Sequence, residues 1–266
     1  MNISKQLIAA ASLAALCSLG HAASLSAAGY SENFDTMGLA GTAAPTGWSV
    51  WNGEANTANN TWTSSITANG TTKSVASMVK SNVALTATNN PSGTKNAGFN
   101  AAFAADALAD RVLASSPTTV SGAAFQLELS NDTGASFSAL SISFDTRRFS
   151  TASSANELPG YQLFFSLDGS TWSNVAALNP TLASLPNSIG LSAISQATVE
   201  LGAEVANGQQ LTLRWVDDNA TQTSPDQIIG LNNVTVLAAA VPEPSSYALL
   251  LAGLGLLGLR ARQRRG

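Results

Sequence analysis

Carboxylates are the main side chains after position 22 that could carry out chemistry, because the only Cys, Cys17, and the only His, His21, come before it. A Ser-His-Asp triad, a Cys nucleophile and a zinc or haem site with His ligands are therefore excluded from the rest of the chain. Hydrolysis of a sugar bond would need two carboxylates, one on each side of the bond. The spacing pairs no two of the conceivable members, which are Glu128, Asp145, Glu157, Glu200 and Glu204.

Flat aromatic rings are a second kind of candidate site, because many sugar-binding β-sandwiches expose indole rings on which pyranose faces stack. Trp48, Trp51 and Trp62 lie near Asn/Thr-rich stretches, whereas alternation places Trp172 and Trp215 in the core. Tryptophan is more often a core residue than an exposed one, so both interpretations stay open at this stage. We predict Trp51 and Trp62 as the candidate ligand-binding residues.

A run of oxygen-bearing side chains near the C-terminal part of the domain could hold calcium. Asp217, Asp218, Asn219 and Asp226 fall within ten residues, between two predicted strands. Calcium takes about 6–8 oxygen ligands, and an acidic domain without His or Cys suits it better than softer metals. The spacing is not that of an EF-hand loop, and such residues also collect in ordinary solvated turns. Calcium therefore stands beside a plain turn as a hypothesis.

The elements that must position these residues are strands. Apolar and polar residues alternate with period two over 125–129, 140–144, 161–167, 199–201, 211–215 and 229–236, with turn residues between the segments. The window 101–113 has a poor helical period, so we expect a loop that leads into a short strand around 111–114. These patterns predict an all-β fold, a single jelly-roll-like β-sandwich over residues 23–240.

Residues 1–22 have the features of a cleaved signal peptide. Lys5 precedes an apolar run over 7–19, and Gly20-His21-Ala22 supplies the small residues of a cleavage site. A membrane anchor would need roughly 20 apolar residues and a charged flank after them, and neither is present. We therefore expect an exported protein.

The C-terminal segment 241–266 has three parts in a fixed order. The breaker Pro242-Glu243-Pro244 comes first, followed by an apolar stretch over 247–259 and then a basic cluster that contains Arg260, Arg262, Arg264 and Arg265. As a helix, the apolar stretch would be about 20 Å long, short of the hydrocarbon core of a bilayer at ~30 Å. The arginines would stay on the cytoplasmic side. This order predicts a short, transient membrane segment.

The tail resembles a PEP-CTERM sorting signal in its Pro242-Glu243-Pro244 motif, its Gly-rich apolar stretch and its terminal arginines. The resemblance implies processing by the membrane protease exosortase, with transient anchoring in the inner membrane. Residues 30–237 are similar to exported bacterial jelly-roll domains in motifs such as Glu32-Asn33-Phe34-Asp35 and Pro45-Thr46-Gly47-Trp48. Most such domains have no assigned activity.

Charge and composition narrow the function further. Between residues 22 and 241 there are 7 basic and 15 acidic side chains, a net charge of 7 − 15 = −8, which speaks against nucleic acid as a partner. We therefore expect a protein of the cell envelope or biofilm matrix that is not an enzyme, with exopolysaccharide binding as the more specific hypothesis. The alternative is an extracellular carboxylate-dependent glycoside hydrolase or polysaccharide lyase.

Overall fold

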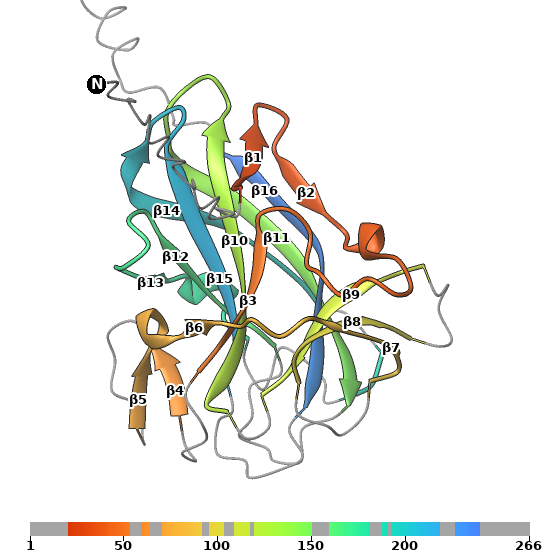
Figure 1. The fold of residues 1–266 in the computed structure, drawn as a ribbon. Coiled ribbons are helices and arrows are strands. Elements are labelled where there is room, and N and C mark those ends of the chain that lie inside the picture. Colours follow the sequence, from red (N-terminus) through yellow and green to blue (C-terminus); the bar gives the residue numbers. More distant parts are fainter. Residues whose placement is uncertain are drawn as a thin grey trace, which may run out of the picture.

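Strands make up nearly all the regular structure of the chain (Figure 1). The computed structural model describes residues 21–53, 60–63, 71–91, 96–103, 109–117, 120–150, 160–180, 188–190, 193–218 and 227–239. Within these ranges the only helices are three 3₁₀ turns: η1 (Asp35–Met37), η2 (Val75–Ser77) and η3 (Ala176–Leu178). The predicted signal peptide up to residue 20 and the predicted sorting helix over 241–266 lie outside the described residues.

Two seven-stranded sheets, called sheet A and sheet B, form the sandwich. Sheet A runs in the order β13 (Ser173–Asn174), β12 (Gln162–Ser166), β15 (Gln210–Asp218), β10 (Gly122–Asp132), β3 (Trp48–Asn52) and β6 (Val79–Lys80). A further strand, β1 (Ala23–Ser26), pairs in parallel with the second half of β10, beyond the part that pairs with β3. The first strand of sheet A therefore begins directly after the predicted cleavage site.

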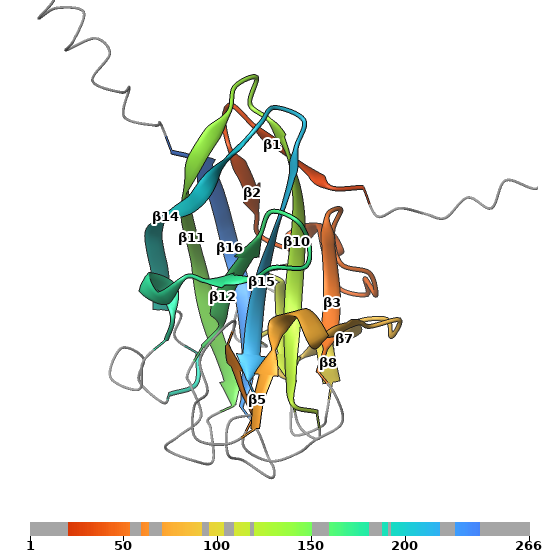
Figure 2. The same cartoon turned by 90° about the vertical axis from the view of Figure 1, so that its left-hand side faces the viewer.

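Sheet B is built on the longest strands. Its order is β14 (Ala193–Val205), β11 (Phe137–Ser150), β16 (Ile228–Ala238), β9 (Val112–Ser116), β8 (Asn96–Ala102) and β7 (Thr86–Asn89), and β2 (Tyr30–Glu32) pairs with β16. A separate parallel pair consists of β4 (Asn60–Thr63) and β5 (Thr71–Ser74). Strands that follow one another in the sequence often lie in different sheets, as do β10 and β11, and as do β14, β15 and β16 in turn. These crossings between the two layers, seen in Figure 2, give the fold its jelly-roll-like character.

The core lies between the sheets, and the predicted alternation fills it. The inward side chains of β10 and β15 meet those of β11, β14 and β16 from the other sheet. Trp215 is at the centre, with its ring centroid 5.3 Å from that of Trp48 and 5.9 Å from that of Phe144. All six strand predictions made from alternation are confirmed, and the strand expected around 111–114 is β9.

A buried arginine holds the sheet B edge to the N-terminal segment. Arg111 is fully buried, and its Nε donates to Asn100 Oδ1 at 2.6 Å while its Nη1 donates to Asn89 Oδ1 at 2.8 Å. Its backbone N–H donates to Asp35 Oδ1 at 2.9 Å. Asn100 in turn donates from Nδ2 to the carbonyl of Gly38 at 2.8 Å. The Arg111 side chain therefore connects β7 with β8, and Asn100 connects β8 with the loop after η1.

Replacement of Arg111 by Met should lower the free energy of unfolding by about 3 kcal/mol or more. The substitution removes the donor to the buried Asn100 Oδ1 and to the buried Asn100 carbonyl, and each buried acceptor without a donor costs about 1–3 kcal/mol. Lys80→Met is the control, since Lys80 is exposed on an edge strand and its loss should cost less than about 0.5 kcal/mol. Urea denaturation of both variants measures the difference, and equal midpoints would contradict this role for Arg111.

Candidate functional site

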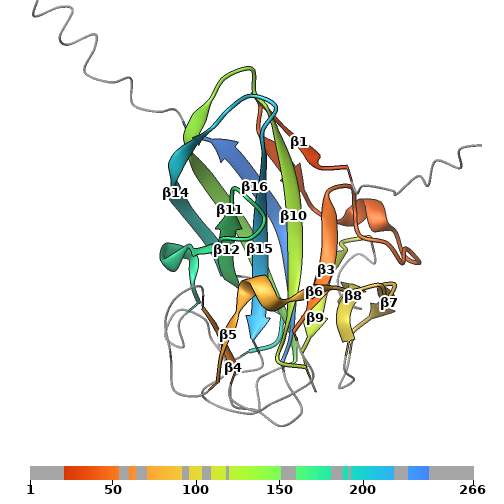
Figure 3. The same ribbon diagram turned by 60° about the vertical axis from the view of Figure 1, so that its left-hand side comes forward.

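The face of sheet A that points away from the core carries an aligned row of functional side chains. The strand registers place Ser49 of β3 beside Gln126 of β10, Gln126 beside Arg214 of β15, and Arg214 beside Phe164 of β12. Alternation requires this placement, because the neighbours Leu213 and Trp215 point into the core. Figure 3 shows β12, β15, β10 and β3 side by side in this sheet.

Arg214 is held between two indole rings, an arrangement that we call the tryptophan–arginine stack. Its guanidinium carbon lies 4.2 Å from the ring centroid of Trp51 and 4.1 Å from that of Trp172. Both distances fall within the range of a cation–π interaction, which is strongest for desolvated cations. Only 3% of Arg214 is exposed to solvent. The two rings therefore cover both faces of the guanidinium.

Each nitrogen of the guanidinium also donates a hydrogen bond. Nε donates to Gln126 Oε1 at 3.0 Å, Nη2 donates to the same oxygen, and Nη1 donates to the carbonyl of Val75 at 2.5 Å. Burial lowers the pKa of Arg214 to about 10, against the opposing effect of the nearby Glu128 carboxylate. The side chain stays charged at neutral pH. Its cationic group is therefore a fixed part of the structure.

A small apolar cluster outside the sandwich supports the stack. Val75 and Met78, from η2 and the residue that follows it, pack with Trp172 and with the outward side chains of β10, β12 and β15. Trp51 packs against the same cluster and is only partly buried. The turn at η2 thus lies over the outer face of sheet A and fixes the position of both rings.

An open cleft of about 610 Å³ lies next to the stack on the same face. Its polar lining comes from the strands and from the turns at their ends. The lining residues are Trp51, Gln126, Glu128, Leu167, Asp168, Gly169, Trp172, Gln209, Gln210, Thr212 and Arg214. We call it the sheet A cleft. Its hydrogen-bonding groups project from well-paired strands, so their positions do not depend on a ligand.

The turn after β12 forms one wall of the sheet A cleft. Asp168 Oδ1 accepts hydrogen bonds from the backbone N–H groups of Ser170 at 2.7 Å and Thr171 at 2.6 Å, and from the Ser166 hydroxyl at 3.0 Å. These donors hold the pKa of Asp168 well below its usual range. Gly169 adopts a φ of 73°, which a residue with a side chain rarely takes. The chain therefore turns tightly after β12, and the carboxylate of this turn is ionised.

The five tryptophans have different places in this arrangement. Trp51 belongs to the sheet A cleft, whereas the side chain of Trp62 lies outside the described residues. Trp48 is 7% exposed and packs in the core, where its Nε1 donates to the Tyr30 hydroxyl at 2.6 Å. Trp215 is in the core as predicted. Trp172 is buried as well, but against Arg214 outside the sheets and not between them.

Three of the candidate carboxylates, Glu128, Asp145 and Glu200, lie far from one another. Glu128 and Asp145 lie on the outer faces of opposite sheets, so the whole sandwich separates them. Glu200 pairs with Ala139, six residues from Asp145 along β11, which is about 20 Å in an extended strand. Glu157 lies outside the described residues. Among the described residues, therefore, neither Glu128 nor Asp145 lies beside another of the predicted carboxylates.

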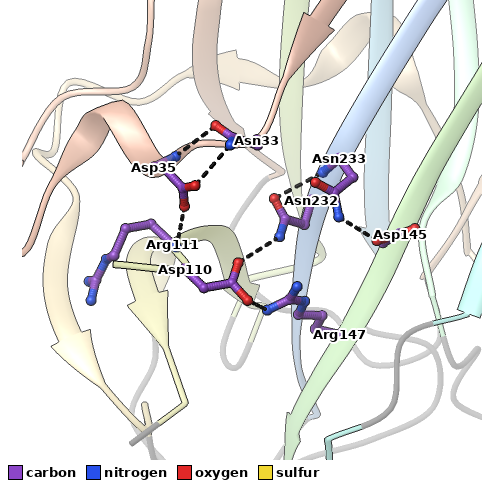
Figure 4. Close-up of polar contacts among 8 residues, drawn as sticks. All are labelled: Asn33, Asp35, Asp110, Arg111, Asp145, Arg147, Asn232 and Asn233. Carbon is purple, nitrogen blue, oxygen red and sulfur yellow. Dashed lines mark hydrogen bonds and ion pairs between the residues drawn. The ribbon is translucent and has the colours of Figure 1, made fainter. Parts of the chain in front are cut away.

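Figure 4 shows Asp145 at the margin of a polar cluster next to sheet B. Asn233 donates from Nδ2 to Asp145 Oδ2 at 2.6 Å and adopts a left-handed φ of 48° at a β-bulge. Asp110 forms an ion pair with Arg147 and accepts from Asn232 Nδ2 at 3.3 Å. The carboxylates here bind partners of the chain itself. Among the described residues, no three His, Cys, Asp or Glu side chains form a group that could hold a metal ion.

The two described members of the calcium hypothesis, Asp217 and Asp218, are the last residues of β15. Asp217 Oδ2 accepts a hydrogen bond from the Ser115 hydroxyl at 2.7 Å, so this carboxylate belongs to a buried network. Asp218 is buried next to it, and desolvation raises its pKa to about 7. Asn219 and Asp226 lie outside the described residues. Calcium binding at this end of β15 stays a prediction.

The stability of the protein should fall as the pH rises from about 4 to about 7. In this window the folded chain keeps a proton on Asp218 that the unfolded chain releases, so each pH unit weakens the native state. Thermal melting should therefore start earlier at pH 8 than at pH 5, and Asp218→Asn should flatten this dependence. The matched control is Asp132→Asn, at the exposed end of β10.

The same thermal melts test the calcium hypothesis. An ion that binds only the folded chain, at the ionised carboxylate of Asp218, would stabilise the native state by mass action. Millimolar calcium should restore the melting temperature at pH 8, and a chelator should lower it again. No response of the wild-type chain to either addition would leave this segment an ordinary turn.

The sequence matches a family model described as the PEP-CTERM protein-sorting motif over residues 240–265. The chain therefore carries this sorting signal, which confirms the resemblance seen in the tail, and the motif indicates an exported protein. None of the helices in the described ranges has the length and apolar character needed to cross a bilayer. A comparison with curated proteins gave no match.

Three solved structures that resemble the chain are carbohydrate-binding modules. A xylan-binding module has 16% identity and a TM-score of 0.32, over 48% of this chain and 77% of the module. A module in complex with β-1,4-galactotriose has 10% identity and a TM-score of 0.31, over 56% and 86%. A module specific for non-crystalline cellulose has 10% identity and a TM-score of 0.32, over 53% and 82%. These matches are too distant to assign a ligand to this chain.

Proposed function

We propose that this chain is an exported polysaccharide-binding protein of the cell envelope or biofilm matrix, without catalytic activity, and that the sheet A cleft is its binding site. The observation that carries the proposal is the tryptophan–arginine stack beside a row of strand-borne amide, hydroxyl and carboxylate groups. Binding sites for small molecules combine such a rigid aromatic surface with a few fixed polar groups.

The chemistry of the sheet A cleft suits a sugar ring. A pyranose has an apolar face of C–H groups and a rim of hydroxyls, so it needs a flat ring and hydrogen-bond partners side by side. One face of Trp51 packs on Arg214, and its partial exposure leaves part of the indole at the wall of the cleft. Glu128, Thr212 and Gln210 line the same cleft and can accept or donate hydrogen bonds to hydroxyls.

Binding is favoured over hydrolysis because of the state of the two carboxylates in the sheet A cleft, Glu128 and Asp168. A glycosidase needs one carboxyl group with a raised pKa to protonate the leaving oxygen. Asp168 has the opposite shift, because three donors of its own turn stabilise the ionised form. The other carboxylate, Glu128, accepts a hydrogen bond from Gln126 Nε2 at 2.9 Å, which fixes its position on the sheet. Asp168 therefore does not have the raised pKa that a general acid needs.

Delivery of the binding domain would depend on the tail. The last strand ends at Ala238, and Ala239 still donates its backbone N–H to the carbonyl of Ala139 at 2.9 Å. The sorting motif begins at the next residue, 240. Exosortase would therefore cut only a few residues from the folded sheet, with the inner membrane as a transient anchor and release to the envelope or matrix as the outcome.

Deletion of residues 241–266 should leave the domain folded and change only its destination. No described strand includes any of these residues, so the melting temperature should stay within a few degrees of that of the processed chain. Cell fractionation should then show the shortened protein away from the site where the processed protein accumulates. Full-length protein that stays stably in the inner membrane with its arginines would indicate a plain anchor.

Trp51→Ala should weaken polysaccharide binding by about tenfold or more at a modest cost in stability. The substitution removes a partly exposed ring and one cation–π contact, worth about 0.5–2 kcal/mol. Trp48→Ala is the matched control, because truncation of a core tryptophan costs about 3–5 kcal/mol. Affinity electrophoresis against a panel of polysaccharides, with thermal melts of the same samples, separates the two effects. Wild-type affinity in Trp51→Ala would refute the assigned site.

A further inference from the structure

We propose that the sheet A cleft selects polysaccharides without acidic groups and excludes those rich in uronic acids, with Glu128 as the specificity-determining residue. This inference rests on the proposed function of the cleft and names the class of sugar that it takes. It follows from where the charged groups of the lining point and from what each of them already binds.

Among the described residues, the only basic one in the lining is Arg214, and just 3% of its surface is open to solvent. Two indole rings cover its faces, and its Nε, Nη1 and Nη2 donate to Gln126 and to the carbonyl of Val75. Proteins recognise carboxylates chiefly through the two-pronged edge of an accessible arginine. Here that edge is turned into the protein, where the Val75 turn covers it.

The acidic residues of the lining are open to solvent by comparison. Asp168 is exposed, and Glu128 is only partly buried. Asp168 is ionised at neutral pH, since its own turn donates three hydrogen bonds to the carboxylate. A neutral sugar would donate its hydroxyls to these oxygens, which strengthens the hydrogen bonds. A uronate would instead bring a third negative charge beside two others.

The charges determine how much more weakly an acidic sugar should bind than a neutral one. Like charges about 6 Å apart at the edge of a protein weaken binding by about tenfold, and salt reduces the effect when the groups are exposed. The net charge of −8 between residues 22 and 241 adds a weaker, long-range repulsion of any polyanion. Arg214 offsets part of the charge of Glu128, so the substitution of Glu128 should have a measurable but incomplete effect.

The test compares neutral and acidic oligosaccharides of equal length on the full mature chain. Neutral xylo-, cello- and galacto-oligosaccharides serve as the first set, and oligogalacturonate and oligomannuronate as the second, in isothermal titration calorimetry. At low salt the best neutral ligand should bind at least tenfold more tightly than either uronate, and the ratio should shrink in 0.5 M salt. A uronate that binds as tightly as the best neutral ligand would overturn the inference while it supports the proposed function.

The variant Glu128→Gln assigns the selectivity to this residue. It keeps the oxygen that accepts from Gln126 Nε2 and removes the charge, so uronate binding should rise about threefold or more. Neutral ligands should bind somewhat more weakly, because their hydroxyls lose a charged acceptor. Glu200→Gln is the control, because it makes the same change in net charge on the outer face of sheet B. Equal effects of both variants would reject Glu128 as the determinant. No binding of any oligosaccharide by the wild-type chain would reject the proposed function itself.

Discussion

The burial of one cation, Arg214, governs the outer face of sheet A. A guanidinium that leaves water must regain its hydrogen bonds and its electrostatic stabilisation inside the protein. Here Gln126, the Val75 carbonyl and two indole rings supply them. These partners come from two strands of sheet A, a 3₁₀ turn and a loop, so the arginine fixes the turn and the loop onto the sheet. The wall of the sheet A cleft is a consequence of that requirement.

The sequence predicts the strands well because the alternation of apolar and polar residues that marks a strand is a local pattern. Alternation over 211–215 places Leu213 and Trp215 inward, and this alone puts Arg214 on the outer face. It does not predict that the arginine is buried, since its contact with Val75 joins residues 139 positions apart. A period-two pattern carries no information about which distant turn will cover a strand. The fold could thus be predicted, but the stack could not.

The candidate site, too, could be predicted from the sequence only in part. Trp51 could be singled out because it lies among polar residues, and it does line the sheet A cleft. Trp172 was expected in the core from alternation, yet its burial comes from contact with Arg214. Asp168 has a turn-forming role that the sequence shows, whereas its position across the cleft from Glu128 depends on how β12 and β10 flank β15. Residues far apart in sequence become neighbours only through sheet order.

The direct junction between β16 and the sorting tail has a mechanical consequence. β16 is an interior strand of sheet B, paired with β11 on one side and with β9 and β2 on the other. Tension applied through the tail would act along this strand, so many hydrogen bonds would share the load in shear, and none could be peeled off singly as at a sheet edge. As long as the tail still anchors the domain, a polymer bound to the opposite sheet would therefore pull on the domain without unfolding it strand by strand.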